Sequence, residues 1–152
     1  MKSRTSVLKR INILYGLVEE IHSGVFRQTV ALVNEADQAI TLQAGQAHAA
    51  GALGRASLRE GDHQEWVFSK AQRELSEARQ QQLKTVREAR VVNTEKARDE
   101  YRASRIKSEQ MKTIVEQSQQ AEDLIAGRRT QAAADDRFLS RLRWKQLHSD
   151  DL

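Results

Sequence analysis

Proline is absent from all 152 residues of this chain, although average usage near 5% would supply roughly seven. Four of its seven glycines fall in one short stretch, at Gly45, Gly51, Gly54 and Gly61. Because proline ends helices and glycine weakens them, this distribution predicts two long uninterrupted segments with one break between them. Both segments are rich in Ala, Gln, Glu, Lys, Arg and Leu, which favour helix. The sequence therefore predicts two long helices folded back on each other.

Composition indicates a narrow apolar contact between helices and no large globular core. Hydrophobic residues make up 39% of the chain, aromatic residues 5% and charged residues 30%. Such a mixture buries a strip along one face of a helix. It is also found in disordered chains, but the net charge of +4 is modest and the apolar spacing is regular. We expect one all-α domain, a long antiparallel two-helix coiled-coil hairpin with a C-terminal helical overhang.

The first predicted helix covers about residues 6–44, where apolar residues recur at seven-residue intervals in two neighbouring ladders. One ladder comprises Ile11, Val18, Val25, Leu32 and Ala39, and the other comprises Phe26, Val33 and Ile40. This spacing places both ladders on one side of a helix. We expect Val18 and Val25 to lie in the contact between the helices, where aspartate at either position would abolish cooperative melting. More than half of residues 7–42 are apolar, which exceeds what one narrow strip requires.

The predicted turn region is residues 45–61, within which part of the chain can stay helical and the turn itself can be short. Asp62 marks its end, because its carboxylate can accept from the first free amides of a helix. Glu65 follows three residues later, as in a capping box. The second predicted helix covers about residues 62–147, and Gly127 can kink or fray it before its last stretch.

That last stretch is rich in basic residues. They are Arg128, Arg129, Arg137, Arg141, Arg143 and Lys145. Counted back from a turn near residue 60, the first helix covers the second only to about residue 115. The basic tail would then extend roughly 30 residues further, about 45 Å at 1.5 Å per residue. Lys and Arg attract nucleic-acid phosphates, but Asp135 and Asp136 interrupt the charge and only Phe138 and Trp144 can stack on bases. We expect a protein partner at this tail and no nucleic acid.

No motif for catalysis or ligand binding is present. The chain has no G-x-G-x-x-G or P-loop pattern, and no serine or cysteine nucleophile stands beside a plausible histidine base. Four scattered histidines share no metal-ligand spacing. They are His22, His48, His63 and His148. We expect a protein that is not an enzyme, with no cofactor and no metal.

The absence of cysteine suits a reducing compartment. The most apolar N-terminal run, from Val7 to Val18, is broken by Lys9 and Arg10 and is too short to span a bilayer. It also lacks a cleavage pattern of small residues. We expect a cytoplasmic protein that is peripheral at the inner face of the cell membrane at most.

Trp66, Val67 and Phe68 follow the predicted cap directly. Three consecutive residues of a helix cannot all face one strip. They either cover the turn end of the hairpin or anchor a partner, since buried aromatic residues dominate interface energies.

Three segments resemble the coiled-coil stalk proteins of type III export systems, the flagellar export protein FliJ and its injectisome counterparts of the YscO type. VLKRINILYGLVEEIHSGVFRQ is similar to the family's opening helix, and FSKAQRELSEARQQQLKTVREAR to the start of its second helix. RRTQAAADDRFLSRLRWKQ resembles its closing pattern of basic residues and glutamine, an acid, then alanine or an aromatic residue and arginine.

The resemblance implies a two-helix coiled coil similar to part of the rotary stalk of F-type ATPases. It implies that one end enters a hexameric export ATPase, and we assign the basic tail to this role. It also implies a contact with the cytoplasmic domain of the export gate, a membrane protein, through an apolar face early in the second helix. The nearest matching residues here are Phe68 and Leu75, with Ala71 and Ala78 on neighbouring spacings, whereas Gln72 and Arg79 depart from the pattern on the same face. The candidate gate-binding residues are Trp66, Phe68, Ala71 and Leu75. Export chaperones are further candidate partners.

A function of another class stays open, a coiled-coil scaffold or chaperone-like adaptor that binds client segments along the apolar first helix. A stalk should stimulate assembly or turnover of its cognate ATPase, whereas an adaptor should leave ATPase kinetics unchanged. The sequence favours neither a flagellar nor a virulence system, and neither a monomeric hairpin nor a four-helix dimer.

Overall fold

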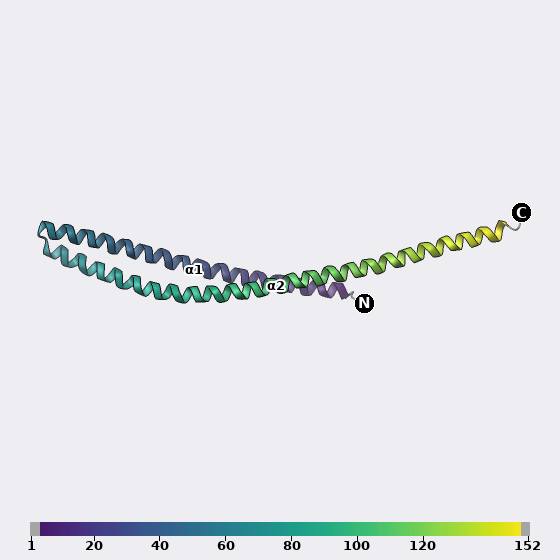
Figure 1. Cartoon of the computed structure of the whole chain (residues 1–152), viewed down its shortest axis with the longest axis horizontal. Coiled ribbons are helices and arrows are strands. Elements are labelled where there is room, and N and C mark those ends of the chain that lie inside the picture. The colour runs from purple at the N-terminus through teal and green to yellow at the C-terminus, as the bar shows by residue number, and fades with distance from the viewer. Residues whose placement is uncertain (1–3, 150–152) are drawn as a thin grey trace. The chain divides into compact units, whose positions relative to one another are not determined.

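A computed structural model describes residues 4–149, with side chains from 4 to 147, and Figure 1 shows the two helices that it contains. Helix α1 spans Arg4–Glu60 and helix α2 spans His63–Ser149. Within the described range, Gly61 and Asp62 alone lie outside a helix. The prediction of an all-α protein made of two long helices in contact is confirmed.

The first helix is longer than predicted, because the chain stays helical through residues 45–60, which we expected to form a turn region. Gly45, Gly51 and Gly54 each cost about 1 kcal/mol relative to alanine in a helix, but none of the three has a positive φ. Gly54 lies on the side of α1 that contacts α2, where a Cβ atom would come within 3.4 Å of the Ser69 Cβ. Glycine here lets the helices approach closely, and it does not break the helix.

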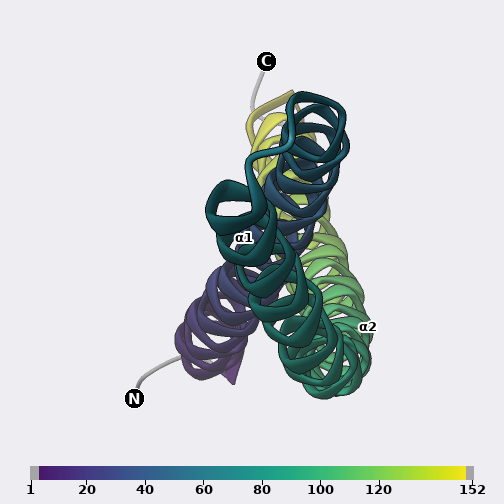
Figure 2. The same cartoon turned by 90° about the vertical axis from the view of Figure 1, so that its left-hand side faces the viewer.

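The turn is a two-residue motif at Gly61 and Asp62, seen end-on in Figure 2. Gly61 has a φ of +77°, a left-handed conformation that favours glycine. The Asp62 amide donates to the Ser57 carbonyl at 2.9 Å, and the Gly61 amide donates to the Leu58 carbonyl at 3.4 Å. These two bonds form a Schellman motif, which satisfies the last free carbonyls of α1.

Asp62 also begins α2, as predicted. Its Oδ1 accepts from the Glu65 amide at 3.1 Å, and its carbonyl accepts from the Trp66 amide at 3.1 Å. An N-cap carboxylate satisfies a backbone donor that the first turn leaves free. One residue therefore completes the end of α1 and the start of α2, which is why the turn needs no further residues.

Contacts divide the chain into two compact units, one of residues 18–105 and one of residues 1–17 with 106–152. In the first unit, one regular series of buried and half-buried residues runs along each helix, mostly at alternating spacings of three and four. On α1 it comprises Glu19, His22, Phe26, Thr29, Val33, Ala36, Ile40, Gln43, Ala47, Ala50, Gly54 and Ser57; on α2 it comprises Trp66, Ser69, Ser76, Gln80, Leu83, Arg87, Arg90, Thr94, Ala97, Tyr101 and Ser104. We call these residues the inner seam. The spacing is that of helices packed side by side.

The second unit pairs the first turns of α1 with the middle of α2. Ser108 and Met111 of α2 are buried, as is Thr5 of α1. The hydroxyls of Thr5 and Ser118 lie 2.7 Å apart, which ties the start of α1 to α2. From residue 123 to residue 147 every side chain is exposed.

The predicted ladder of Ile11, Val18, Val25, Leu32 and Ala39 has no buried member. Val18 is 44% exposed, Val25 42% and Leu32 39%, and Ile11 and Ala39 are half-buried. The other predicted ladder, Phe26, Val33 and Ile40, does lie in the inner seam. The two ladders are neighbours on the helix, offset by one residue, and α2 covers only one of them.

Candidate functional site

The inner seam is made mainly of small and polar side chains. Its fully buried members are Ala36, Ala47, Ala50, Ser57, Ser69, Ser76, Ala97 and Ser104. Some of these hydroxyls bond within their own helix: Ser57 Oγ donates to the Leu53 carbonyl at 2.9 Å, and Ser104 Oγ donates to the Tyr101 carbonyl at 2.8 Å. Small residues remove little apolar area from water, so the seam provides close approach with little hydrophobic stabilisation.

Two seam atoms of the first unit are buried without a hydrogen-bond partner among the described residues, Ser69 Oγ and Gln43 Oε1. Each such group costs about 1–3 kcal/mol when its solvation is not replaced. A seam that buries alanine, serine and unpaired polar atoms stabilises a helix pair weakly.

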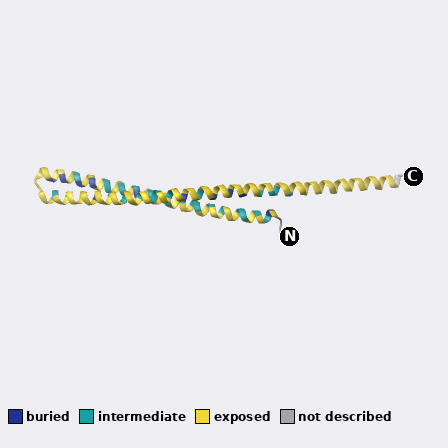
Figure 3. Ribbon diagram, turned by 60° about the horizontal axis from the view of Figure 1, so that its bottom comes forward, coloured by how far each residue is buried: buried dark blue, intermediate teal, exposed yellow. Residues whose placement is uncertain are grey.

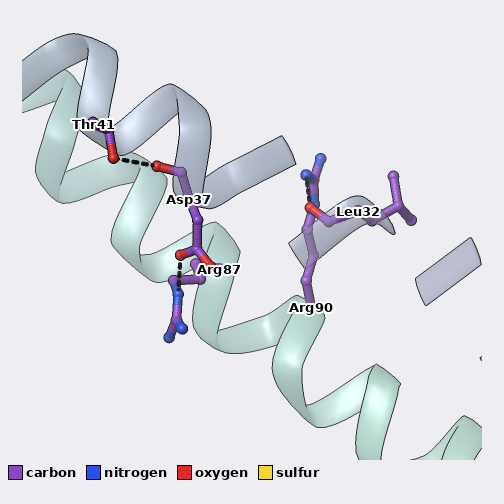
Figure 4. A network of polar contacts seen from close by, with 5 residues as sticks. All are labelled: Leu32, Asp37, Thr41, Arg87 and Arg90. Atoms are coloured by element: carbon purple, nitrogen blue, oxygen red, sulfur yellow. Dashed lines mark hydrogen bonds and ion pairs between the residues drawn. The ribbon is translucent and has the colours of Figure 1, made fainter. Parts of the chain in front are cut away.

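Polar and aromatic contacts across the seam add to this packing, and Figure 4 shows the two that involve arginine. Arg87 Nε donates to Asp37 Oδ1. Arg90 Nη1 donates to the Leu32 carbonyl at 2.7 Å and lies 3.5 Å from a carboxylate oxygen of Glu35. Charge-assisted hydrogen bonds of this kind fix the register of two helices. These arginines were not predicted to contact α1, because basic residues on a polar helix usually face water.

An aromatic pair and a histidine contact lie further along the same unit. The rings of Phe26 and Tyr101 stack with centroids 6.2 Å apart and planes at 11°. His22 Nδ1 lies 3.7 Å from Glu100 Oε2. Stacked rings contribute beyond their buried area, so this pair adds stabilisation to the seam.

The four residues that the resemblance assigns to the gate do not share one surface. Trp66 is half-buried on the inner seam, where its Cδ1 lies 3.9 Å from the position of a Cβ on Gly54. Phe68 is 62% exposed and Leu75 51%, and Ala71 between them is exposed too. Trp66 therefore contributes to the packing of the two helices, whereas Val67 and Phe68 of the same cluster are exposed.

Phe68, Ala71 and Leu75 follow one another at spacings of three and four, which puts them on one exposed face of α2. We call them the α2 apolar face. Leu75 also borders a shallow groove between the helices. The groove is lined by Gln46, Ala49, Ala50 and Leu53 of α1 and by Gln72, Leu75, Ser76 and Arg79 of α2. An exposed apolar face beside a groove suits docking of another protein chain.

All six basic side chains of the tail are exposed, as Figure 3 shows for this whole part of α2. Within residues 4–149 none of the six makes an ion pair. Asp135 instead accepts from Gln131 at 3.2 Å, and the Asp136 carbonyl accepts from Ser140 at 2.8 Å. Phe138 and Leu142 lie beside Arg141 and Lys145 around one shallow depression, so apolar and basic groups share a face.

An apolar stripe on the face of α1 next to the inner seam was predicted wrongly to be the contact with α2. Its large side chains in the first unit are Val18, Ile21, Val25, Leu32, Leu42 and Leu53. Their exposed fractions run from 39% at Leu32 to 64% at Ile21. The excess of apolar residues over the needs of one strip was the signal for it, and two strips on one helix account for that excess.

No protein-family model, curated protein or solved structure matches this chain. Within the described helices no stretch is long and apolar enough to cross a membrane. In the same range no three potential metal-ligating side chains come together. The surfaces that stand out are the basic tail, the α2 apolar face and the outer stripe of α1, all of which suit binding to macromolecules.

Proposed function

We propose that this chain is a non-catalytic coiled-coil stalk component of a bacterial type III protein export apparatus, which couples the hexameric export ATPase to the export gate. The observation that carries the proposal is the basic tail. Residues 123–147 form a helix whose side chains are all exposed. A long helix that packs against nothing is marginal in water. A partner that surrounds it would supply the missing contacts.

In this proposal the tail is an overhang that enters the ring of the ATPase. Arg128, Arg129, Arg137, Arg141, Arg143 and Lys145 would provide the electrostatic attraction. Phe138 and Leu142, beside Arg141 and Lys145, would provide apolar contacts once water is excluded. Mixed basic and apolar faces of this kind combine fast association with a desolvated anchor.

The α2 apolar face would contact the cytoplasmic domain of the gate. Phe68 and Leu75 are more than half exposed, so they can bind a partner without any rearrangement of the helix pair. Trp66 is removed from the proposed contact set and is assigned to the inner seam. The protein would then act in the cytoplasm, peripheral to the membrane through the gate, with export chaperones as further candidate partners.

The test is an ATPase assay with the cognate export ATPase. The Arg137→Glu, Arg141→Glu, Arg143→Glu triple variant should keep its helicity, because all three side chains are exposed, and should lose stimulation of ATP turnover. A matched control reverses three exposed basic residues of α2 outside the tail, Lys84, Arg98 and Arg102. Stimulation by the wild type should fall as salt rises. Full stimulation by the tail variant at low salt would overturn the proposal.

The scaffold or adaptor function is favoured by a different observation, the exposed outer stripe of α1. An adaptor would leave the kinetics of the ATPase unchanged. Wild-type protein without any effect on turnover or ring assembly would therefore support the adaptor and count against the stalk.

A further inference from the structure

The distribution of apolar residues over α1 is inverted relative to their burial. In residues 18–60 the buried apolar side chains are Ala36, Ala47 and Ala50, whereas larger ones such as Ile21 and Leu42 are 64% and 61% exposed. Folding normally buries the larger apolar side chains first, because stabilisation scales with the apolar area removed from water. A helix that is apolar on two sides is normally covered on both.

The exposed residues belong to a regular pattern of their own, in which Ala39 alone is half-buried. Positions 18, 21, 25, 28, 32, 35, 39, 42, 46, 49, 53 and 56 alternate at spacings of three and four, which is the pattern of a coiled-coil seam. We call it the outer seam. It is apolar except at Gln28, Glu35 and Gln46, and along its side away from α2 lie the small residues Gly24, Ala31, Gly45 and Ala52. Small residues beside a seam let two helix backbones approach closely.

We propose that the outer seam binds the outer seam of a second copy of this chain, with the two α1 helices antiparallel across a two-fold axis. Two observations favour a second copy. The pattern is self-complementary in one register, and the segment from residue 28 to residue 54 carries almost no charge. The inference is independent of the proposed function.

The register is set by the two glutamines. In an antiparallel pair the numbers of facing residues have a constant sum, and a sum of 74 places Ile21 against Leu53, Leu32 against Leu42 and Gln28 against Gln46. Apolar layers then meet apolar layers, and the two amides can bond to each other. A shift by one heptad places Gln46 against Ile21, or Gln28 against Leu53, which would bury an amide without a partner.

Charge favours the same arrangement. From residue 28 to residue 54 the only carboxylates or cations are Glu35 and Asp37, and both contact arginines of α2. A parallel pair would place Glu35 opposite its own copy, whereas the antiparallel register places it opposite Ala39.

The overlap covers residues 18–56, which lie within one compact unit. It extends about 57 Å at 1.5 Å per residue. That length gives room for the roughly 800 Å² per partner of a standard protein interface. Homodimer interfaces are the more apolar class, in agreement with the composition of the outer seam.

Sedimentation of the full chain tests the proposal. We expect the wild type to be dimeric at about 100 μM, which requires only a modest affinity. Leu32→Asp and Leu42→Asp should each raise the dissociation constant by about 100-fold or more, because each places a carboxylate in the interface. Helicity should be retained, since both side chains are exposed in the single chain. Val30→Asp is the matched control, an exposed residue on the opposite side of α1, and should change the constant less than about threefold.

Cross-linking tests the register, since the chain has no cysteine of its own. The Gln28→Cys, Gln46→Cys double variant should give a disulfide-linked dimer on oxidation, because the two positions in one chain are too far apart to pair with each other. Gln28→Cys alone, and Gln28→Cys with Ala39→Cys, should stay uncross-linked.

Several results would overturn the proposal. A wild-type chain that stays monomeric at about 100 μM would show that the outer seam does not bind a second copy. The proposed function in protein export would be unaffected by that result. Cross-linking of Gln28→Cys alone would show a parallel pair. Equal effects of Val30→Asp and Leu32→Asp would show that the contact does not follow the outer seam.

Discussion

Arg90 of α2 donates to the backbone carbonyl of Leu32, at 2.7 Å, while the side chain of Leu32 is 39% exposed on the neighbouring face of α1. At this point α2 therefore contacts the backbone of α1, and the side chain of Leu32 stays accessible to another surface. A related division holds along this unit of α1, where the most buried side chains are small and several large apolar side chains, such as Ile21 and Leu42, are exposed. A helix pair built in this way combines a weak internal contact with a strongly apolar exterior.

Removing Arg90 should destabilise the helix pair more than removing Arg87. Arg90→Ala deletes a hydrogen bond from a charged donor and should cost about 1 kcal/mol. Arg87→Ala breaks a pair whose side chains are 43% and 47% exposed, so water screens it and the cost should be about 0.5 kcal/mol. Urea denaturation at a concentration where the chain is monomeric measures both. An equal or reversed order would show that the carbonyl contact contributes little.

Substitution by alanine should change the stability of the chain in opposite directions at two glycines. Gly45 is helical and a Cβ there would meet nothing within 4 Å, so Gly45→Ala should stabilise the chain by about 0.5–1 kcal/mol through helix propensity. Gly61 has a φ of +77°, and Gly61→Ala should destabilise it by about 1 kcal/mol through backbone strain. Thermal melting gives both signs. A stabilising Gly61→Ala would mean that the turn is not held in the left-handed conformation.

Ser69 provides a test of the polar seam. Its Oγ is buried without a partner among the described residues, so Ser69→Ala should stabilise the chain by about 1 kcal/mol or more, from propensity and from the relief of an unsatisfied hydroxyl. Ser57→Ala is the control, because the Ser57 hydroxyl bonds to the Leu53 carbonyl and only the propensity term should appear. If the two substitutions have the same effect on the melting temperature, the Ser69 hydroxyl has a partner such as water.

The sequence alone predicted the two helices and the cap at Asp62, because both rest on local rules. Helix length depends on the absence of proline and on the abundance of strong helix formers. An acid at the N-cap satisfies amides within its own turn. The end of the first helix was placed 16 residues too early, at residue 44 instead of Glu60. Glycine frequency signals a turn, but it does not separate a glycine that a helix tolerates for close packing, such as Gly54, from one that ends a helix, such as Gly61.

The face of α1 that meets α2 could not be predicted from hydrophobicity. The ladder of Val18 and Val25 is the more apolar one, yet α2 covers the ladder of Phe26 and Val33. Which ladder α2 covers depends on the residues opposite, and α2 brings serine, alanine and arginine to the contact. The apolar pattern of one helix does not include the residues of its partner, so the more apolar ladder was predicted to contact α2.

Substitutions on the two sides of α1 should therefore differ in a monomeric sample. Ala36 is 1% exposed, and Ala36→Asp would bury a carboxylate without a partner in the inner seam, at a cost of several kcal/mol. Val25→Asp would place the carboxylate in water and should leave cooperative melting intact. Circular dichroism at low micromolar concentration, where a dimer dissociates, compares them. Loss of cooperative melting in Val25→Asp under these conditions would restore the original assignment of the ladder.

The final prediction concerns the α2 apolar face in the proposed export function. Phe68→Ala and Leu75→Ala should weaken binding to the cytoplasmic domain of the gate while stimulation of the ATPase stays unchanged. Both side chains are more than half exposed, so their loss removes contact area for a partner without loosening the inner seam. Val92→Ala is the matched control, since Val92 is 51% exposed on the same helix and lies 17 residues beyond Leu75. Binding measured by titration calorimetry, beside ATPase assays on the same samples, separates the two surfaces. If Phe68→Ala and Leu75→Ala lower ATPase stimulation and spare gate binding, the assignment of partners to the two surfaces is reversed.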